Sequence, residues 1–177
     1  MSKLAALTVL PMMLGLMGCS NSTPAPAPAD TKKEGAATEA HHEHKPPHHG
    51  TLVEFGEEFS HLELVLDPAT GTLKAYVLDG EAEKTIRIAV PELEIKAQLS
   101  GADGKKTDTI LKLSAQADEL TGEKVGDTSV FQVQNDALKG VKDFDGTVSV
   151  LTIKGKEFKD TKFNYPKGNE AEEAPKK

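Results

Sequence analysis

Apolar and polar residues alternate with a period of two along the middle of this chain. The alternation is clearest in residues 62–66 and again in residues 73–77, where every second side chain is aliphatic. Between these two runs lies Asp67-Pro68-Ala69-Thr70-Gly71, a sequence rich in turn-forming residues. Because side chains of a β-strand repeat with a period of two, the pattern predicts a β-hairpin here.

The same alternation continues on both sides of this hairpin. Only residues 136–144 favour a helix, of one or two turns. Eight or nine short strands with a turn about every ten residues indicate an all-β fold. We expect an antiparallel β-sandwich of immunoglobulin-like size, with a barrel as the alternative. The first strand of the hairpin covers residues 60–66 in full, and the further predicted strands are residues 51–55, 85–90, 93–99, 109–114, 129–134, 147–153 and 157–163.

The composition changes at both ends of this β-rich region, which spans residues 48–165. Residues 19–47 contain alternating proline and alanine, then a polar stretch and a histidine cluster, without apolar periodicity. Such a segment predicts a flexible tether. Residues 166–177 are polar again and predict a disordered tail. The foldable part is therefore one domain of about 115 residues, an ordinary domain size.

The first eighteen residues have the layout of a secretory signal peptide. Lys3 precedes an apolar stretch over residues 4–16, which is too short to span a bilayer because a spanning helix needs about 20 apolar residues. The stretch ends in Leu16-Met17-Gly18-Cys19, which resembles the lipobox of bacterial lipoproteins. This resemblance implies cleavage before Cys19 and a membrane-anchoring lipid on Cys19. An ordinary secretory signal with an incidental cysteine is the alternative.

The residue after Cys19 bears on localisation. Resemblance to sorted lipoproteins implies the periplasmic side of the cell envelope, and Ser20 favours the outer membrane over the inner membrane. An aspartate is the usual inner-membrane retention signal at that position. We therefore expect a lipid-anchored protein of the cell envelope.

The charge and the sulfur content of the mature chain limit the kinds of molecule and metal ion that it can bind. Without residues 1–18 the chain has 20 basic and 28 acidic residues, a net charge of −8 with histidine neutral. An acidic protein disfavours nucleic acid and anionic lipid headgroups and is compatible with cations. All four methionines lie in residues 1–18, and Cys19 is the only cysteine. The mature chain therefore offers imidazole and carboxylate donors, which suit Zn(II), Cu(II) and Ni(II) and disfavour Cu(I).

All six histidines lie within residues 41–61. Imidazole is the commonest protein ligand for divalent transition metals. A flexible histidine run binds such ions loosely, so the informative member is the one in a predicted strand, His61. The others are His41, His42, His44, His48 and His49.

If residues 51–55 pair with residues 60–66, matching Phe55 with Ser60, then His61 lies opposite Glu54. The strand face that carries this pair also carries Glu63, and the tether ends beside it. We therefore expect a Zn(II) or Cu(II) site formed by His61, His49, His48, Glu63 and Glu54, with His41, His42 and His44 as auxiliary ligands. Two alternatives stay open: a non-specific histidine-rich tether, or a solvent-facing strand without a metal role.

Residues 48–80 read HHGTLVEFGEEFSHLELVLDPATGTLKAYVLDG. This run resembles a segment of uncharacterised envelope lipoproteins of the Planctomycetes and Verrucomicrobia type. It is also similar to histidine-containing modules attached to periplasmic adaptor subunits of heavy-metal efflux pumps. The resemblance implies periplasmic metal binding, with His49 and His61 at the matching positions, and an envelope or metal-efflux protein as partner. The chain lacks the helical hairpin and lipoyl-like parts of a whole adaptor.

Sequence patterns of catalysis do not fit this chain. It has no G-x-S-x-G nucleophile motif, and Gly101 and Gly104 are too close together for a phosphate-binding loop. We therefore expect no enzyme and weigh two functions. The first is a lipoprotein that buffers or hands on a divalent metal; the second is a structural or protein-interaction module of the envelope with incidental histidines.

Overall fold

The structure, a computed structural model, describes residues 44–100 and 104–169. The expected signal peptide, Cys19, His41 and His42 lie outside the described residues. Within the described ranges no helix has the length and apolar character needed to cross a membrane. The elements are β1 (Thr51–Phe55), β2 (Ser60–Asp67), β3 (Thr72–Leu78), β4 (Glu92–Ser100), β5 (Lys106–Ala115), β6 (Val130–Gln134), the short 3₁₀ helix η1 (Asp136–Leu138), β7 (Phe144–Ile153) and β8 (Lys156–Tyr165).

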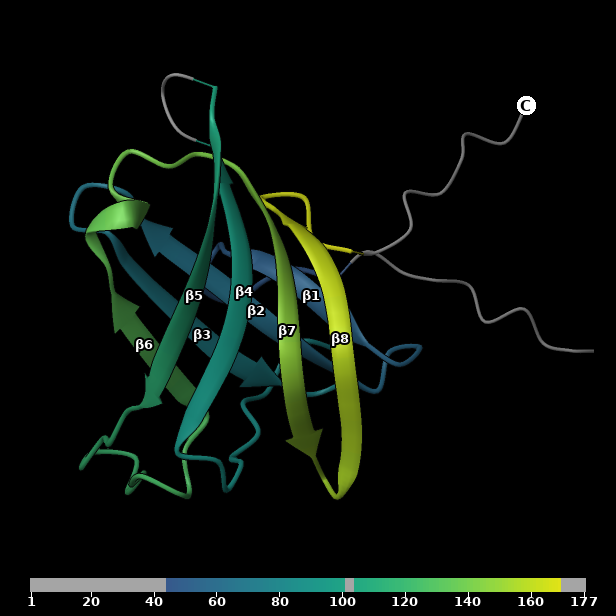
Figure 1. The fold of residues 1–177 in the computed structure, drawn as a ribbon. Helices are drawn as coiled ribbons and strands as arrows, with labels where there is room; N and C mark the ends of the chain where they lie inside the picture. Colours follow the sequence, from purple (N-terminus) through teal and green to yellow (C-terminus); the bar gives the residue numbers. More distant parts are fainter. Residues whose placement is uncertain (1–43, 101–103, 170–177) are drawn as a thin grey trace, which may run out of the picture. The chain divides into compact units, whose positions relative to one another are not determined.

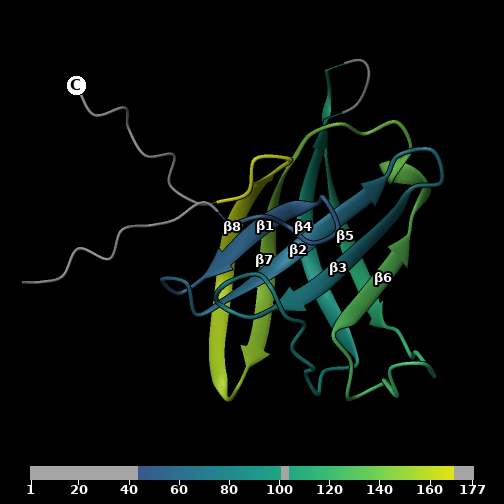
Figure 2. The ribbon, with the colours of Figure 1, turned by 180° about the vertical axis from the view of Figure 1, so that it is seen from behind.

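These strands form one antiparallel sheet in the order β1-β2-β3-β6-β5-β4-β7-β8. The sheet curves round until β1 and β8 come together, giving a nearly closed barrel (Figures 1 and 2). The prediction of an antiparallel all-β fold is confirmed. A single continuous sheet corresponds to the barrel alternative, because a sandwich would divide the strands between two sheets.

The interior of the barrel is filled by the apolar residues that the alternation places on one side of each strand. Leu62, Leu64 and Phe131, for example, have no exposed surface or almost none. Burying a side chain of this size contributes roughly 1.5–3 kcal/mol. The large residues fully buried there are Phe55, Phe131, Phe144, Leu62, Leu64, Leu73, Leu93, Ile95, Leu111, Leu113 and Leu138. Leu78 is also fully buried, but it packs with Leu52 and Ala82 in a separate small cluster.

The predicted turn between β2 and β3 is fixed by the side chain of Asp67. Its carboxylate accepts hydrogen bonds from Thr70 Oγ1 at 2.8 Å and from the Ala69 amide at 2.9 Å. These bonds, led by the one from Thr70, lower the pKa of the Asp67 carboxyl. Gly71 completes the turn with φ +70°, a conformation that glycine adopts without steric cost.

The prediction of a strand at residues 85–90 is wrong. This segment forms only two isolated bridges, from Thr85 to Leu78 and from Ile88 to Thr128. It has no continuous neighbour, and Pro91 lacks the amide proton that a ladder would need. The predicted helix over residues 136–144 is confined to η1, whose first turn is capped by the side chain of Asn135.

The seam between β1 and β8 is covered by the residues that follow β8. The side chain of Asn169 accepts from the Glu54 amide at 2.7 Å and donates to the Glu54 carbonyl at 3.0 Å, so it imitates a strand partner. Thr51 donates to the Pro166 carbonyl at 3.0 Å. Residues 166–169, expected to belong to the tail, therefore cover a sheet edge that would otherwise expose unpaired backbone groups.

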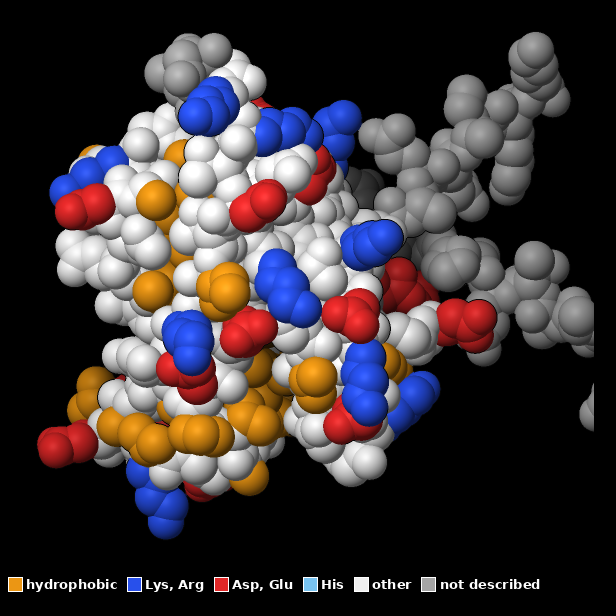
Figure 3. Space-filling view, in the orientation of Figure 1, with side chains coloured by type: hydrophobic (Ala, Val, Ile, Leu, Met, Phe, Trp, Pro, Cys, Tyr) orange, Lys and Arg blue, Asp and Glu red, His pale blue; other side chains and the backbone are white. Residues whose placement is uncertain are grey.

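The face built by β5, β4, β7 and β8 carries lysine and carboxylate side chains interspersed, as Figure 3 shows. Asn164 donates to Asp145 at 3.0 Å, and Lys106 Nζ lies 3.0 Å from the other oxygen of the same carboxylate. Both contacts lower the pKa of Asp145. This mixed surface contrasts with the outer face of β1, β2 and β3, where the histidines gather.

Candidate functional site

The pairing of β1 with β2 has the predicted register. Phe55 lies opposite Ser60, and Glu54 lies opposite His61. The outer face of this pair differs from a solvent-facing strand, however, because His61 and Glu63 are both 0% exposed. The interpretation of these two residues as part of a solvated face is therefore wrong. Their burial follows from residues 44–50, whose contacts with Glu63 and with His61 bring this segment onto the outer face.

Glu63 attaches this segment to the barrel through both oxygens of its carboxylate. Oε1 accepts the backbone amide of His48 at 2.7 Å and that of Gly50 at 2.9 Å. Oε2 lies 2.7 Å from Nδ1 of His48. We call this arrangement of Glu63, His48 and Gly50 the clasp. Hydrogen bonds to an ionised carboxylate are shorter and stronger than neutral ones, so the clasp holds the chain firmly at the start of β1.

Gly50 is required by the close approach of the chain to β2 at this point. A Cβ added at Gly50 would lie 2.5 Å from the carbonyl oxygen of Leu64. Any larger residue would push the segment away from β2 and lengthen the bonds to Glu63. The glycine that follows His49 in the sequence therefore serves packing in this structure.

The ring of His48 stacks on Tyr76 of β3. The ring centroids are 3.8 Å apart and the planes are 9° from parallel. The His48 ring thus covers one face of the phenol. The Glu63 carboxylate lies beside the phenol because Tyr76 and Glu63 are paired in the β2–β3 register. Burial, and then the charge of Glu63, raise the pKa of Tyr76.

His44 and His61 form the second contact between the segment and the sheet. Their rings meet edge to face with centroids 4.6 Å apart. Nδ1 of His61 lies 3.2 Å from the carbonyl oxygen of Asp79. Because a carbonyl oxygen only accepts, Nδ1 carries the proton and the lone pair of a neutral His61 ring resides on Nε2. The Nε2 atoms of both rings are buried.

The structure separates the other predicted ligands from this pair. His49 is exposed and has φ +61°. Glu54 lies opposite His61 in the register, and its carboxylate accepts the amide of Glu58 at 2.6 Å. Across residues 44–100 and 104–169 no three His, Cys, Asp or Glu side chains converge closely enough to hold a metal ion. The described site is therefore a pair of imidazoles next to the clasp.

Two residues that contact this site, Tyr76 and Asp79, were not predicted from the sequence to belong to it. Tyr76 was placed correctly in a strand, and the register of the β2–β3 hairpin, counted from the turn, would have set it opposite Glu63. Asp79 contributes only its backbone carbonyl to His61. No sequence signal marks a carbonyl contact, so this partner could not have been found before the structure.

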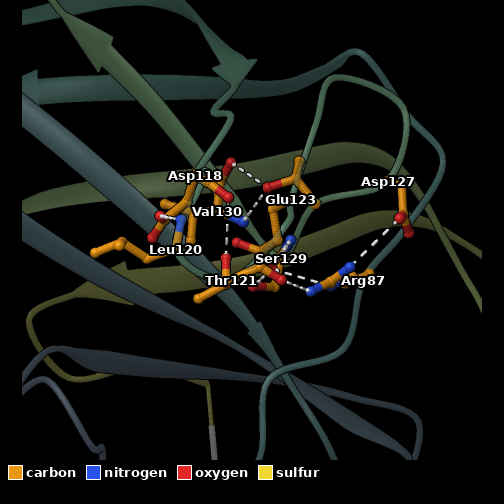
Figure 4. Close-up of polar contacts among 9 residues, drawn as sticks. Arg87, Asp118, Leu120, Thr121, Glu123, Asp127, Ser129 and Val130 are labelled. Carbon is orange, nitrogen blue, oxygen red and sulfur yellow. Dashed lines mark hydrogen bonds and ion pairs between the residues drawn. The ribbon is translucent and has the colours of Figure 1, made fainter.

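A second polar cluster joins the loop between β5 and β6 to Arg87 of the β3–β4 connection, as Figure 4 shows. The buried Glu123 accepts from Ser129 through its amide at 3.1 Å and its hydroxyl at 2.6 Å. Arg87 Nε lies 3.6 Å from the same carboxylate, and the Arg87 guanidinium also donates to the Thr121 carbonyl. Because these groups satisfy one another, the cluster fixes the loop and has a structural role.

Comparisons of this chain with protein-family models, with curated proteins and with solved structures found no match. The resemblance of residues 48–80 to envelope lipoproteins and to modules of metal-efflux adaptors therefore stays a prediction.

Proposed function

We propose that this protein is a periplasmic lipoprotein, anchored through a lipid on Cys19, that binds a divalent transition metal for buffering or transfer. The metal is Zn(II) or Cu(II), since the mature chain offers nitrogen and oxygen donors without sulfur. The first two ligands are Nε2 of His61 and a ring nitrogen of His44. This set replaces the larger one expected from the sequence, in which His48, His49, Glu54 and Glu63 were also ligands.

The observation that supports this proposal is the meeting of His44 and His61. Metal-binding histidines commonly donate Nδ1–H to a carbonyl or carboxylate, which orients the ring and leaves Nε2 for the metal. His61 has this arrangement through Asp79, and its ring is held in a fully buried position. His44 comes from outside the sheet and lies against it. A pair of imidazoles oriented in this way is half of a four-coordinate zinc site.

Two further donors would complete the coordination. His41 and His42 precede His44 by three and two residues. A chain spans up to about 3.5 Å per residue, so either imidazole is within reach of a metal held at His44. Water can occupy a remaining position, as in zinc sites that exchange ligands. Such a site, formed partly by the tether, suits reversible binding better than permanent structural binding.

The alternative is an envelope interaction module in which the histidines have no metal role. The clasp supports this alternative for His48 alone. The ring of His48 has structural partners in Glu63 and Tyr76 and needs no metal. His44, in contrast, lies with its ring edge to face against the ring of His61, the arrangement on which the metal proposal rests.

Calorimetric titration with Zn(II) and Cu(II) separates these functions. The sample is the chain from residue 19 onward with Cys19→Ser, and the variants are His44→Ala and His61→Phe. We expect one saturable site that each variant weakens at least tenfold. The matched control is His49→Asn, which removes an exposed imidazole and tolerates positive φ. Equal, weak binding by all four proteins would contradict the proposal.

A further inference from the structure

We propose that Glu63 is the positioning residue of this metal site: through the clasp it sets His44 against His61 without binding the metal itself. The inference rests on the proposed function. It assigns the buried carboxylate a role in metal affinity that differs from the ligand role expected from the sequence.

The hydrogen bonds of Glu63 are the first argument. Its carboxylate has no exposed surface, and both oxygens are engaged by His48 and Gly50 at 2.7–2.9 Å. Three donors already occupy this carboxylate, two on Oε1 and one on Oε2, out of about four acceptor positions. A metal on Oε1 would displace a backbone amide and leave a buried donor without an acceptor, which is costly. A buried carboxylate used in this way is a structural group.

The chain between the clasp and His44 is the second argument. His49 donates its amide to the Pro46 carbonyl at 3.1 Å, which closes a turn just before β1. Pro46 and Pro47 have fixed φ angles and add little freedom to this turn. Once Glu63 fixes His48 and Gly50, the direction of the chain toward His44 is therefore fixed as well.

The stacking of His48 on Tyr76 is the third argument. The ring lies flat against the phenol, and Glu63 holds it from the side through Nδ1. Two contacts at different angles define the position of this ring better than either alone. Residues 44–50 are thus attached to the sheet at two points, the clasp and the His44–His61 contact. If the clasp is lost, the ring of His44 is no longer held against His61.

The test uses Co(II), whose visible spectrum reports the ligands, with the variants Glu63→Gln and Glu63→Leu. Glutamine keeps an oxygen acceptor for the two backbone amides, so we expect a wild-type spectrum and affinity within a few-fold of wild type. Leucine removes the clasp, so we expect affinity to fall about 10- to 100-fold, the usual effect of losing a residue that orients a ligand. The matched control is Glu54→Gln, which should bind as wild type does.

The outcomes separate this inference from the proposed function. If wild type does not bind Co(II) at a single site, the proposed function fails. If wild type binds and Glu63→Gln changes the ligand-field bands, Glu63 is a ligand and the inference fails. It also fails if wild type binds and Glu63→Leu retains full affinity. Two measurements without metal control for folding: the amide shifts of the other strands must stay as in wild type, which shows that Glu63→Leu folds, and the nitrogen shifts of the His48 ring must change, which shows that the clasp is lost.

Discussion

Tyr76 stands directly opposite Glu63 in the pairing of β3 with β2, on the outer face of the barrel. The stacked ring of His48 covers the phenol, and the carboxylate lies beside it without solvent exposure. Burial of the phenol is the larger cause of its raised pKa, and the negative charge of Glu63 is the smaller one. The titration of Tyr76 therefore reports whether residues 44–50 lie on the sheet.

The first prediction concerns this titration. In Tyr165→Phe, where Tyr76 is the only tyrosine, the phenolate absorbance should appear at a pH above the ordinary tyrosine pKa of about 10. Adding Glu63→Gln should lower the pKa of Tyr76 but leave it above that value, because burial remains. Because folding raises the pKa of Tyr76, the contribution of this residue to stability is constant below about pH 10 and is lost as the pH rises through the folded pKa. A Tyr76 that titrates at or below the ordinary value would show that the clasp does not form.

The second prediction concerns the lipid. Cys19→Ser should yield a protein that is exported but released from the membrane, because the acyl chains are the hydrophobic anchor expected from the sequence. Fractionation of cells and a salt wash of the membranes measure this, with the unsubstituted chain as control. The lipoprotein proposal is wrong if the variant remains in the washed membranes.

The third prediction concerns the boundaries of the barrel. A non-specific protease should leave a resistant fragment that begins between residues 44 and 48 and ends after Asn169, since Asn169 is bound to β1. Mass spectrometry gives both ends. Zinc should move the N-terminal cut to a position before His44, because the metal would hold that residue on β2. Rapid cleavage inside residues 62–99 would contradict a single folded domain.

The fourth prediction tests the packing of β7 against β8. Gly146 pairs with Phe163, and a Cβ at Gly146 would overlap the Phe163 ring. Gly146→Ala should therefore lower the free energy of unfolding by about 1–3 kcal/mol, as overpacking usually does. Phe163→Leu in the same chain should recover part of this loss because the smaller side chain makes room. Denaturant unfolding of the two single variants and the double variant measures the coupling, and simple additivity would count against this contact.

The sequence predicted the strand pattern well because it depends on local information. Alternation and turn residues sufficed for the β2–β3 hairpin and for the register that sets Glu54 opposite His61. The same information misplaced residues 85–90, which alternate like a strand but have no continuous neighbour. Whether a segment pairs along its length depends on the rest of the sheet.

The burial and contacts of the candidate site residues were harder to predict than the fold, for a related reason. His61 and Glu63 were placed on one face correctly, but their burial depends on residues 44–50, which carry no apolar periodicity. A hydrogen-bonded attachment to a single carboxylate leaves no repeating pattern in the sequence. For this reason His48 was expected to be a ligand, although its Nδ1 bonds to Glu63, and His44 was ranked as auxiliary although its ring contacts His61.

The central claim is that His44 and His61 bind one metal ion together. Pulsed electron paramagnetic resonance of the chain loaded with one equivalent of Cu(II) tests it directly, because the imidazole nitrogens coupled to the copper can be counted. We predict at least two imidazoles in the wild-type chain, one fewer in His44→Ala and in His61→Phe, and no change in His49→Asn. An imidazole count that is the same in all four proteins would contradict the account.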